Sequence, residues 1–124
     1  MHDAAVRRVL VVDDDEGIRE LVVTALAEEG YAVRSASDGE EALAVLDQYD
    51  PQLILLDMRM PVMDGWQFAK SYRERPGPHA PIVICTAALD VRRDATEIGA
   101  DGFLGKPFQL DELLDLVESH TRPS

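Results

Sequence analysis

The chain contains a single cysteine, Cys85, among its 124 residues. One thiol cannot form a disulfide within the chain, so the sequence excludes a disulfide-stapled secreted fold and fits a reducing compartment. No apolar run approaches the roughly 20 residues that a membrane helix requires, and the N-terminus lacks the apolar segment of a signal peptide. These absences predict a soluble, cytoplasmic protein that does not contact a membrane. Because Cys85 lies inside an apolar run, we expect an inert, buried thiol.

Basic residues are also scarce, with 12 Lys and Arg against 24 Asp and Glu, which leaves a formal net charge of −12. Such a surface repels nucleic acid and anionic membranes and favours basic partners. The length of 124 residues suffices for one domain with its own core but not for two. No repeat or linker interrupts the chain. We therefore expect one domain over residues 1–124, with no room for a separate output domain.

Apolar runs of strand length alternate with segments of helical periodicity along the whole chain. Uninterrupted apolar runs are typical of strands buried on both faces of a parallel sheet, whereas partial alternation indicates a strand near an edge. The expected strands are residues 8–12, 31–36 (near an edge), 53–56, 82–86 and 103–104. The expected helices are residues 18–26, a segment that ends at Gln48, and residues 66–73, 92–98 and 110–117. Gly30 is expected to stop the first helix and Gly99 the fourth. Ser37 and Glu40 are expected to form a capping box at the start of the second.

Five strands that alternate with five helices predict an α/β fold, namely a doubly wound (βα)5 sandwich with a five-stranded parallel sheet. Right-handed crossovers that put helices on both faces require the strand order to reverse at one point. With the order 2-1-3-4-5, the reversal falls between the first and third strands, which end at Asp13-Asp14 and at Asp57. Ligands of open parallel sheets bind at such a reversal, outside the carboxyl ends of the strands. Three carboxylates are therefore expected at one crevice.

Asp57 directly follows the strand of residues 53–56, which is a run of four apolar residues. Its position predicts a place at the functional rim of the sheet. Pro61 and the pair Asp64-Gly65 then predict a turn, in which Gly65 can supply a positive φ angle. Two interpretations are open from these residues alone: Asp57 is a functional carboxylate, or it is an acidic residue that merely starts a loop.

Five short motifs follow one another in a distinctive order: Val11-Val12-Asp13-Asp14, Asp57-Met58-Arg59-Met60-Pro61, Met63-Asp64-Gly65, Thr86-Ala87 and Lys106-Pro107-Phe108. In this order and spacing they resemble the receiver domain of two-component response regulators, over essentially the whole chain. The resemblance implies the strand order 2-1-3-4-5, which the chemotaxis member of that family has. It also implies a phosphorylation-dependent signalling module whose partner-binding face changes on phosphorylation.

By this resemblance, Asp57 is the phosphoacceptor and becomes an acyl phosphate. Lys106 and Thr86 would neutralise the oxygens of the transferred group. Thr86 and Phe103 would then form the switch that reports phosphorylation. Phe103 stands where the family often has tyrosine, so a signal carried by a phenol hydroxyl is unavailable here. The resemblance further implies a cis bond between Lys106 and Pro107, against the general preference of X-Pro bonds for trans.

Carboxylates crowded into one cleft repel each other, and a divalent cation relieves that repulsion. Mg²⁺ prefers one or two carboxylates together with water and a phosphate oxygen. The resemblance implies that Asp14 and Asp57 bind Mg²⁺ directly with the backbone carbonyl of Arg59, and that Asp13 acts through a metal-bound water.

The neighbours of these residues receive separate predictions. We expect Asp15 and Asp64 to start turns and helices and not to bind metal. The Arg59 side chain either folds over the phosphoryl group or points into solvent, and the small Ala88 leaves the path of an attacking water open. Three methionines are expected to pack in the loop after the central strand: Met58, Met60 and Met63.

The resemblance implies a histidine kinase or a histidine phosphotransfer protein as phosphodonor and a protein as downstream partner, with no direct contact to nucleic acid or membrane. It does not imply an enzyme that acts on an external substrate. Two alternatives remain from other classes. One is a phosphate-independent interaction domain, which the complete set of pocket residues disfavours. The other is a metal-dependent aspartyl-phosphate hydrolase, which typically needs a second acid two residues after its nucleophile, where this chain has Arg59.

Overall fold

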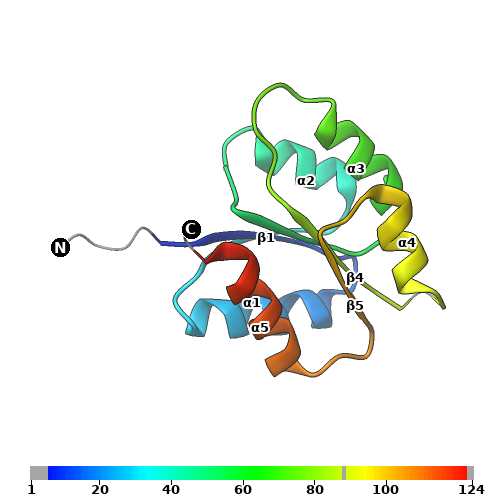
Figure 1. Ribbon diagram of the computed structural model, residues 1–124. Coiled ribbons are helices and arrows are strands. Elements are labelled where there is room, and N and C mark those ends of the chain that lie inside the picture. Colours follow the sequence, from blue (N-terminus) through cyan, green and yellow to red (C-terminus); the bar gives the residue numbers. More distant parts are fainter. Residues whose placement is uncertain (1–5, 88, 123–124) are drawn as a thin grey trace.

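The computed structural model describes residues 6–87 and 89–122, in which five strands alternate with five helices (Figure 1). The strands are β1 (Arg8–Val12), β2 (Ala32–Ala36), β3 (Leu53–Leu56), β4 (Ile82–Thr86) and β5 (Gly102–Gly105). The helices are α1 (Glu16–Glu28), α2 (Gly39–Leu46), α3 (Gly65–Arg73), α4 (Val91–Ile98) and α5 (Leu110–Thr121). Every predicted element is present, with ends that differ from the expected ones by up to four residues.

All strands are parallel, and their order in the sheet is β2-β1-β3-β4-β5, as predicted. The predicted edge strand, residues 31–36, forms β2 at one edge. Register brings Val12 of β1 beside Leu56 of β3. The residues that follow these two strands, Asp13 and Asp57, therefore leave the sheet side by side at its carboxyl edge.

Each face of the sheet carries its own apolar core, because successive side chains of a strand point to opposite sides. In Figure 1, α2, α3 and α4 cover one face, and α1 and α5 cover the other. The first core contains Leu10, Ile54 and Ile84 packed with Phe68 of α3. The second contains Leu55, Val83 and Cys85 packed with α1 and α5. Burial raises the pKa of the Cys85 thiol to about 12, in agreement with the inert thiol that the sequence predicts.

Helix starts confirm two predictions and correct a third. Asp15 caps α1 and Asp64 caps α3, as expected for structural carboxylates. The predicted Ser37–Glu40 capping box is wrong, because Asp38 is the N-cap of α2 and accepts a hydrogen bond from the Glu41 N–H. The Glu41 carboxylate instead accepts from the Ser37 N–H and hydroxyl. The helix also ends at Leu46 and not at Gln48.

The position of α2 is set by a close contact at its first residue, Gly39. A Cβ atom on Gly39 would lie 2.7 Å from Cγ of Met63, in the loop that follows β3. The Gly39 N–H also donates to the Met63 carbonyl oxygen, at 3.1 Å. The absence of a side chain at Gly39 therefore lets the first turn of α2 approach this loop closely.

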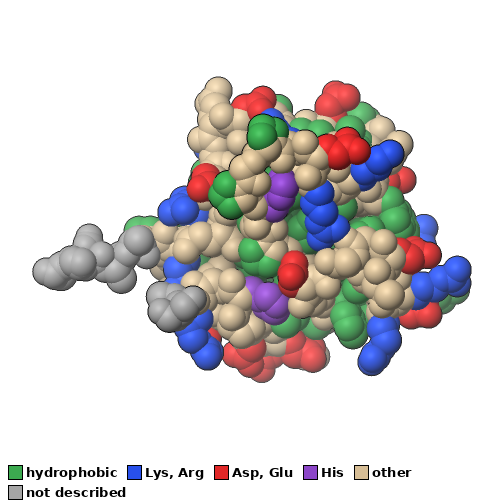
Figure 2. Space-filling model, turned by 45° about the horizontal axis from the view of Figure 1, so that its top comes forward, with side chains coloured by type: hydrophobic (Ala, Val, Ile, Leu, Met, Phe, Trp, Pro, Cys, Tyr) green, Lys and Arg blue, Asp and Glu red, His purple; other side chains and the backbone are tan. Residues whose placement is uncertain are grey.

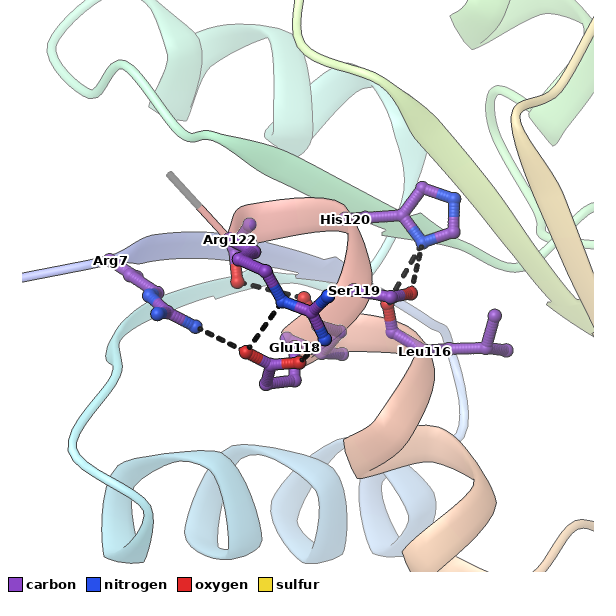
Figure 3. Close-up of polar contacts among 8 residues, drawn as sticks. Arg7, Leu116, Glu118, Ser119, His120 and Arg122 are labelled. Carbon is purple, nitrogen blue, oxygen red and sulfur yellow. Dashed lines mark hydrogen bonds and ion pairs between the residues drawn. The ribbon is translucent and has the colours of Figure 1, made fainter. Parts of the chain in front are cut away.

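The surface is mixed in polarity. Figure 2 shows acidic and basic side chains around the outline of one face, with hydrophobic side chains in small groups between them. On α5, the Glu118 carboxylate lies between Arg7 and Arg122 and joins the start of β1 to the end of the chain's last helix (Figure 3). In the part of the chain that the structure describes, no helix has the length and apolar character of a membrane span.

Candidate functional site

Three carboxyl groups meet at the carboxyl edge of the sheet, where β1 and β3 end. Asp13, Asp14 and Asp57 each offer an oxygen, and these oxygens lie within 4.8 Å of one another. Asp13 is 4% exposed and Asp57 6% exposed, whereas Asp14 is exposed to solvent. Two hydrogen bonds fix the pair: the Asp57 N–H donates to the Val12 carbonyl, and the Asp13 carboxylate accepts from the Asp15 N–H. The cluster is thus open on the side of Asp14.

Lys106 brings a positive charge into this cluster from the loop after β5. Its Nζ lies 2.6 Å from Oδ2 of Asp13 and 3.7 Å from Oδ2 of Asp57, and its side chain is 12% exposed. It is therefore not a solvated surface lysine. Its backbone N–H donates to the Thr86 carbonyl, at 2.9 Å. The bond between Lys106 and Pro107 is cis, as predicted.

Burial raises the pKa of the Asp57 carboxyl to about 6. The charge of Lys106 opposes this effect, the neighbouring carboxyls of Asp13 and Asp14 add to it, and the Arg59 N–H slightly counteracts it. For Lys106, burial alone would lower the pKa, but the hydrogen bond and charge of Asp13 and the charge of Asp57 together raise it. Lys106 therefore stays protonated, while Asp57 is costly to ionise.

The composition of the cluster fits a bound cation. One ammonium group faces three carboxyl groups, so full ionisation leaves an excess of negative charge in a half-buried site. Oxygen ligands of this kind suit a hard divalent ion such as Mg²⁺, which keeps several of its waters. The exposed Asp14 leaves such waters room on one side. The acidic cluster is thus able to hold a metal ion.

The two predicted switch residues lie at different depths. Thr86 ends β4 and is 1% exposed, and its Oγ1 has no hydrogen-bond partner within the described residues. An unpaired buried hydroxyl is costly and gains from a new acceptor. Phe103 of β5 is 37% exposed, and the guanidinium carbon of Arg92 lies 5.4 Å from its ring centroid. In this structure the ring therefore lies at the surface.

The loop after Asp57 departs from its predicted geometry. The positive φ angle expected at Gly65 occurs instead at Val62, with a value of 67°. The Met63 N–H donates to the Pro61 carbonyl at 2.7 Å, which closes a three-residue turn around Val62. Gly65 is required for a different reason: a Cβ there would lie 2.7 Å from Cα of Met58 and 2.9 Å from the Asp57 carbonyl oxygen. The close approach of α3 to the site therefore depends on the absence of a side chain.

The methionines of this loop pack as expected. Met58 is fully buried, Met60 is 9% exposed, and Met63 packs against the same core at its edge.

Arg59 has a partner that the sequence did not reveal. Its backbone N–H donates to Oδ1 of Asp57 at 3.4 Å, but its guanidinium carbon lies over the Trp66 ring, 5.3 Å from the centroid. The Trp66 indole N–H donates to Glu97 of α4, at 3.1 Å. The side chain thus lies over the indole ring and not over Asp57, and it remains exposed to solvent. Ala88, whose small size was expected to leave a water path open, lies outside the described residues.

Comparison with known proteins identifies relatives of the same architecture. Residues 9–118 match the family model described as "Response regulator receiver domain". The positive alginate biosynthesis regulatory protein of Pseudomonas aeruginosa is 39% identical over 119 residues, which cover 94% of this chain and 48% of that protein. A probable transcriptional regulator, ycf27, of Porphyridium aerugineum is 39% identical over 93% of this chain and 48% of its own length. The chain thus spans about half the length of these curated relatives.

Solved structures agree with this match. The chemotaxis response regulator CheY4 of Vibrio cholerae is 34% identical, with a TM-score of 0.85 over 94% of this chain and 99% of that one. The response regulator TrrA of Thermotoga maritima, solved in complex with Mg(2+)-BeF, is 37% identical, with a TM-score of 0.82 over 93% of this chain and 99% of that one.

Proposed function

Because the chain belongs to the response regulator receiver domain family, we propose that Asp57 receives a phosphoryl group from a histidine kinase or a histidine phosphotransfer protein. The family is a phosphorylation-dependent signalling module and not an enzyme that acts on an external substrate. One observation carries the assignment of the acceptor. Asp57 is the buried carboxyl that lies beside Asp13, Asp14 and Lys106 at the end of the central strand. The match over residues 9–118 supports the assignment of residues 1–124 to one receiver domain.

In the proposed transfer, a carboxylate oxygen of Asp57 attacks the phosphorus of a phosphohistidine. A phosphorus–oxygen bond forms as the phosphorus–nitrogen bond breaks, and the imidazole nitrogen keeps the electron pair and takes up a proton. A pKa of about 6 leaves Asp57 mostly ionised at pH 7, as a nucleophile requires. Lys106, 3.7 Å from Oδ2 of Asp57, can donate to an oxygen of the transferred group. The unpaired hydroxyl of Thr86 is the second proposed donor.

We propose Mg²⁺ as the ion of the acidic cluster, held by Asp14, Asp57 and the Arg59 backbone carbonyl directly and by Asp13 through water. When bound, the ion neutralises the negative charge of the carboxylates and of the transferred group. The Mg(2+)-BeF complex of the Thermotoga maritima relative supports this choice.

Mg²⁺ should raise the thermal stability of the protein, since an ion that binds only the native state stabilises it by mass action. At ten times its dissociation constant the expected gain is about 1.4 kcal/mol. Asp14→Ala should erase most of this gain without harming the fold, because Asp14 is exposed. Melting curves with and without Mg²⁺ check this, with Asp115→Ala, an exposed carboxylate on α5, as the matched control. An equal response to Mg²⁺ in Asp14→Ala would place the ion elsewhere.

Receiver domains partner with histidine kinases, and we propose that the phosphorylated form acts through a downstream protein. The net charge of −12 supports a partner with a basic surface and argues against direct contact with nucleic acid. Thr86 and Phe103 are the proposed switch. Phosphorylation would draw the Thr86 hydroxyl towards the phosphoryl group, and the exposed Phe103 ring could then turn inward. A cytoplasmic location remains a prediction from composition.

Incubation with a small phosphodonor and Mg²⁺, followed by a Phos-tag gel, tests this proposal. A phosphate-independent interaction domain would give no shifted band. An aspartyl-phosphate hydrolase would release phosphate from external substrates with many turnovers. Such enzymes typically need a second acidic residue two positions after the nucleophile, and this chain has Arg59 at that position.

Arg59→Ala should change the rate at which the phosphorylated protein loses its phosphoryl group, in the direction of faster loss. The Arg59 backbone lies beside Asp57, and a guanidinium can bind phosphoryl oxygens bidentately and screen them from water. The decay of the phosphorylated form at saturating Mg²⁺ gives the answer. Arg34→Ala is the matched control, because Arg34 lies over the Tyr49 ring at 5.5 Å, on the edge strand. Identical half-lives in Arg59→Ala and the wild type would show that Arg59 does not act on the phosphoryl group.

A further inference from the structure

We infer that Trp66 is a positioning residue for Arg59: it holds the guanidinium away from the phosphorylated Asp57 and so shortens the lifetime of the phosphoryl group. The inference rests on the proposed function, since it concerns how long Asp57 stays phosphorylated. It adds two residues, Trp66 of α3 and Glu97 of α4, to those that govern the site.

The backbone of Arg59 places its side chain within reach of two competing partners. Its N–H donates to Oδ1 of Asp57 at 3.4 Å, so the side chain starts next to the phosphoacceptor. The guanidinium carbon nevertheless lies over the Trp66 ring, 5.3 Å from its centroid, which is within the range of a cation–π contact. Arg59 can therefore occupy the indole face or the phosphoryl group, but not both.

The indole ring is held in place by α4. Its N–H donates to Oε1 of Glu97 at 3.1 Å, and Oε2 of the same carboxylate lies 3.6 Å from Nε of Arg93. These contacts fix the ring between α3 and α4 at the side of an open groove of about 600 Å³. Arg59, Trp66 and Glu97 all line this groove, which gives the guanidinium space to move.

Phosphorylation changes the balance between the two partners. A phosphoryl group brings up to two negative charges and three strong acceptor oxygens, and charge-assisted bonds to a guanidinium are stronger than an exposed cation–π contact. Because the indole face offers a second partner, a fraction of the Arg59 side chains remains on Trp66. In that fraction the guanidinium does not shield the phosphoryl group. Hydrolysis then proceeds from the unshielded form: a water oxygen bonds to phosphorus as the bond between phosphorus and the Asp57 oxygen breaks, Asp57 is left as carboxylate, and inorganic phosphate departs with both protons of the water.

A double-mutant cycle tests the inference at saturating Mg²⁺, with the decay of the phosphorylated protein as readout. Trp66→Leu should lengthen the half-life by up to about fivefold, the upper limit that an exposed cation–π contact of about 0.5–1 kcal/mol allows. Arg59→Ala should shorten the half-life, and the double variant should decay like Arg59→Ala alone. Glu97→Ala, which alters an exposed side chain, should act in the same direction as Trp66→Leu but more weakly.

Trp66 is the only tryptophan, so its fluorescence reports the contact independently of the decay. The emission of the wild type should change on phosphorylation, and that change should be smaller in Arg59→Ala. An equal effect of Trp66→Leu with and without Arg59, or no effect with Arg59 present, would overturn the inference. A wild-type chain that takes up no phosphate would instead contradict the proposed function itself.

Discussion

The substitution Asp57→Asn is expected to abolish phosphate uptake while the fold remains intact. An amide has nearly the shape of the carboxyl group, but its oxygen is a far weaker nucleophile. Asp57 is the buried carboxyl at the end of the central strand, β3, and lies 3.7 Å from the ammonium of Lys106. Asp13 follows β1 and is already hydrogen-bonded to Lys106, at 2.6 Å. A Phos-tag gel after incubation with a small phosphodonor and Mg²⁺ should show a shifted band for the wild type and none for the variant.

The same substitution should stabilise the metal-free protein at neutral pH. The pKa of Asp57 rises from 3.8 to about 6 on folding, so ionisation costs stability as the pH rises through that value. Below pH 3.8 the carboxyl is neutral in both states and the cost disappears. The shift corresponds to about 3 kcal/mol at most, and solvent at the open side of the cluster reduces our expectation to about 1–2 kcal/mol.

Asp115→Asn is the matched control for both measurements, because it makes the same chemical change on an exposed face of α5. It should bind phosphate as the wild type does and leave the stability unchanged. Phosphate uptake by Asp57→Asn at the wild-type rate would show that the acceptor is another residue.

Lys106→Met should destabilise the protein by about 3 kcal/mol at pH 7, since loss of one partner leaves buried charges unpaired. Lys106 is the cation that lies within 4.0 Å of Asp13 and Asp57 among the described residues. Without it, the pKa of the Asp57 carboxyl should rise further, because the charge of Lys106 holds it down in the wild type. The loss of stability should therefore be largest above pH 7 and shrink as the pH falls towards 4, because Asp57 takes up a proton in the native state over this range.

Urea unfolding at several pH values in the absence of divalent ions measures this effect. The chain's other lysine, Lys70, lies exposed on α3, so Lys70→Met is a control that removes the same charge outside the cluster. Equal destabilisation by the two variants at all pH values would mean that net charge, and not the pocket, explains the loss. Mg²⁺ should restore part of the stability of Lys106→Met, because a divalent ion can take over the neutralisation of the carboxylates.

The order of the elements could be predicted from local signals. The continuous apolar runs of β3 and β4 can only be buried with helices on both faces, and the carboxyl ends of parallel strands meet at one edge. The meeting of Asp13 and Asp57 followed from this geometry, because each residue directly follows an apolar run.

Helix starts were harder to predict, because adjacent residues offered alternative caps. Ser37 and Asp38 are both good N-caps by residue type, and in the structure it is the Asp38 side chain that accepts the Glu41 N–H. In the same way, a glycine in a turn suggests a positive φ, but Gly65 is needed because α3 approaches Met58 closely. The positive φ instead falls on Val62, which no local preference favours.

By itself, then, the amino-acid sequence determined the fold class and the edge of the sheet at which the acidic residues gather, because apolar periodicity and strand ends are local properties. The strand order came from the resemblance of its motifs to the receiver family. Only the tertiary structure decided the partner of Arg59. Arg59, Trp66 and Glu97 come from a loop and two different helices, and they meet because α3 and α4 pack side by side on one face of the sheet. Such a contact has no sequence period, since its geometry depends on how whole helices dock and on which rotamers the packed surface leaves open.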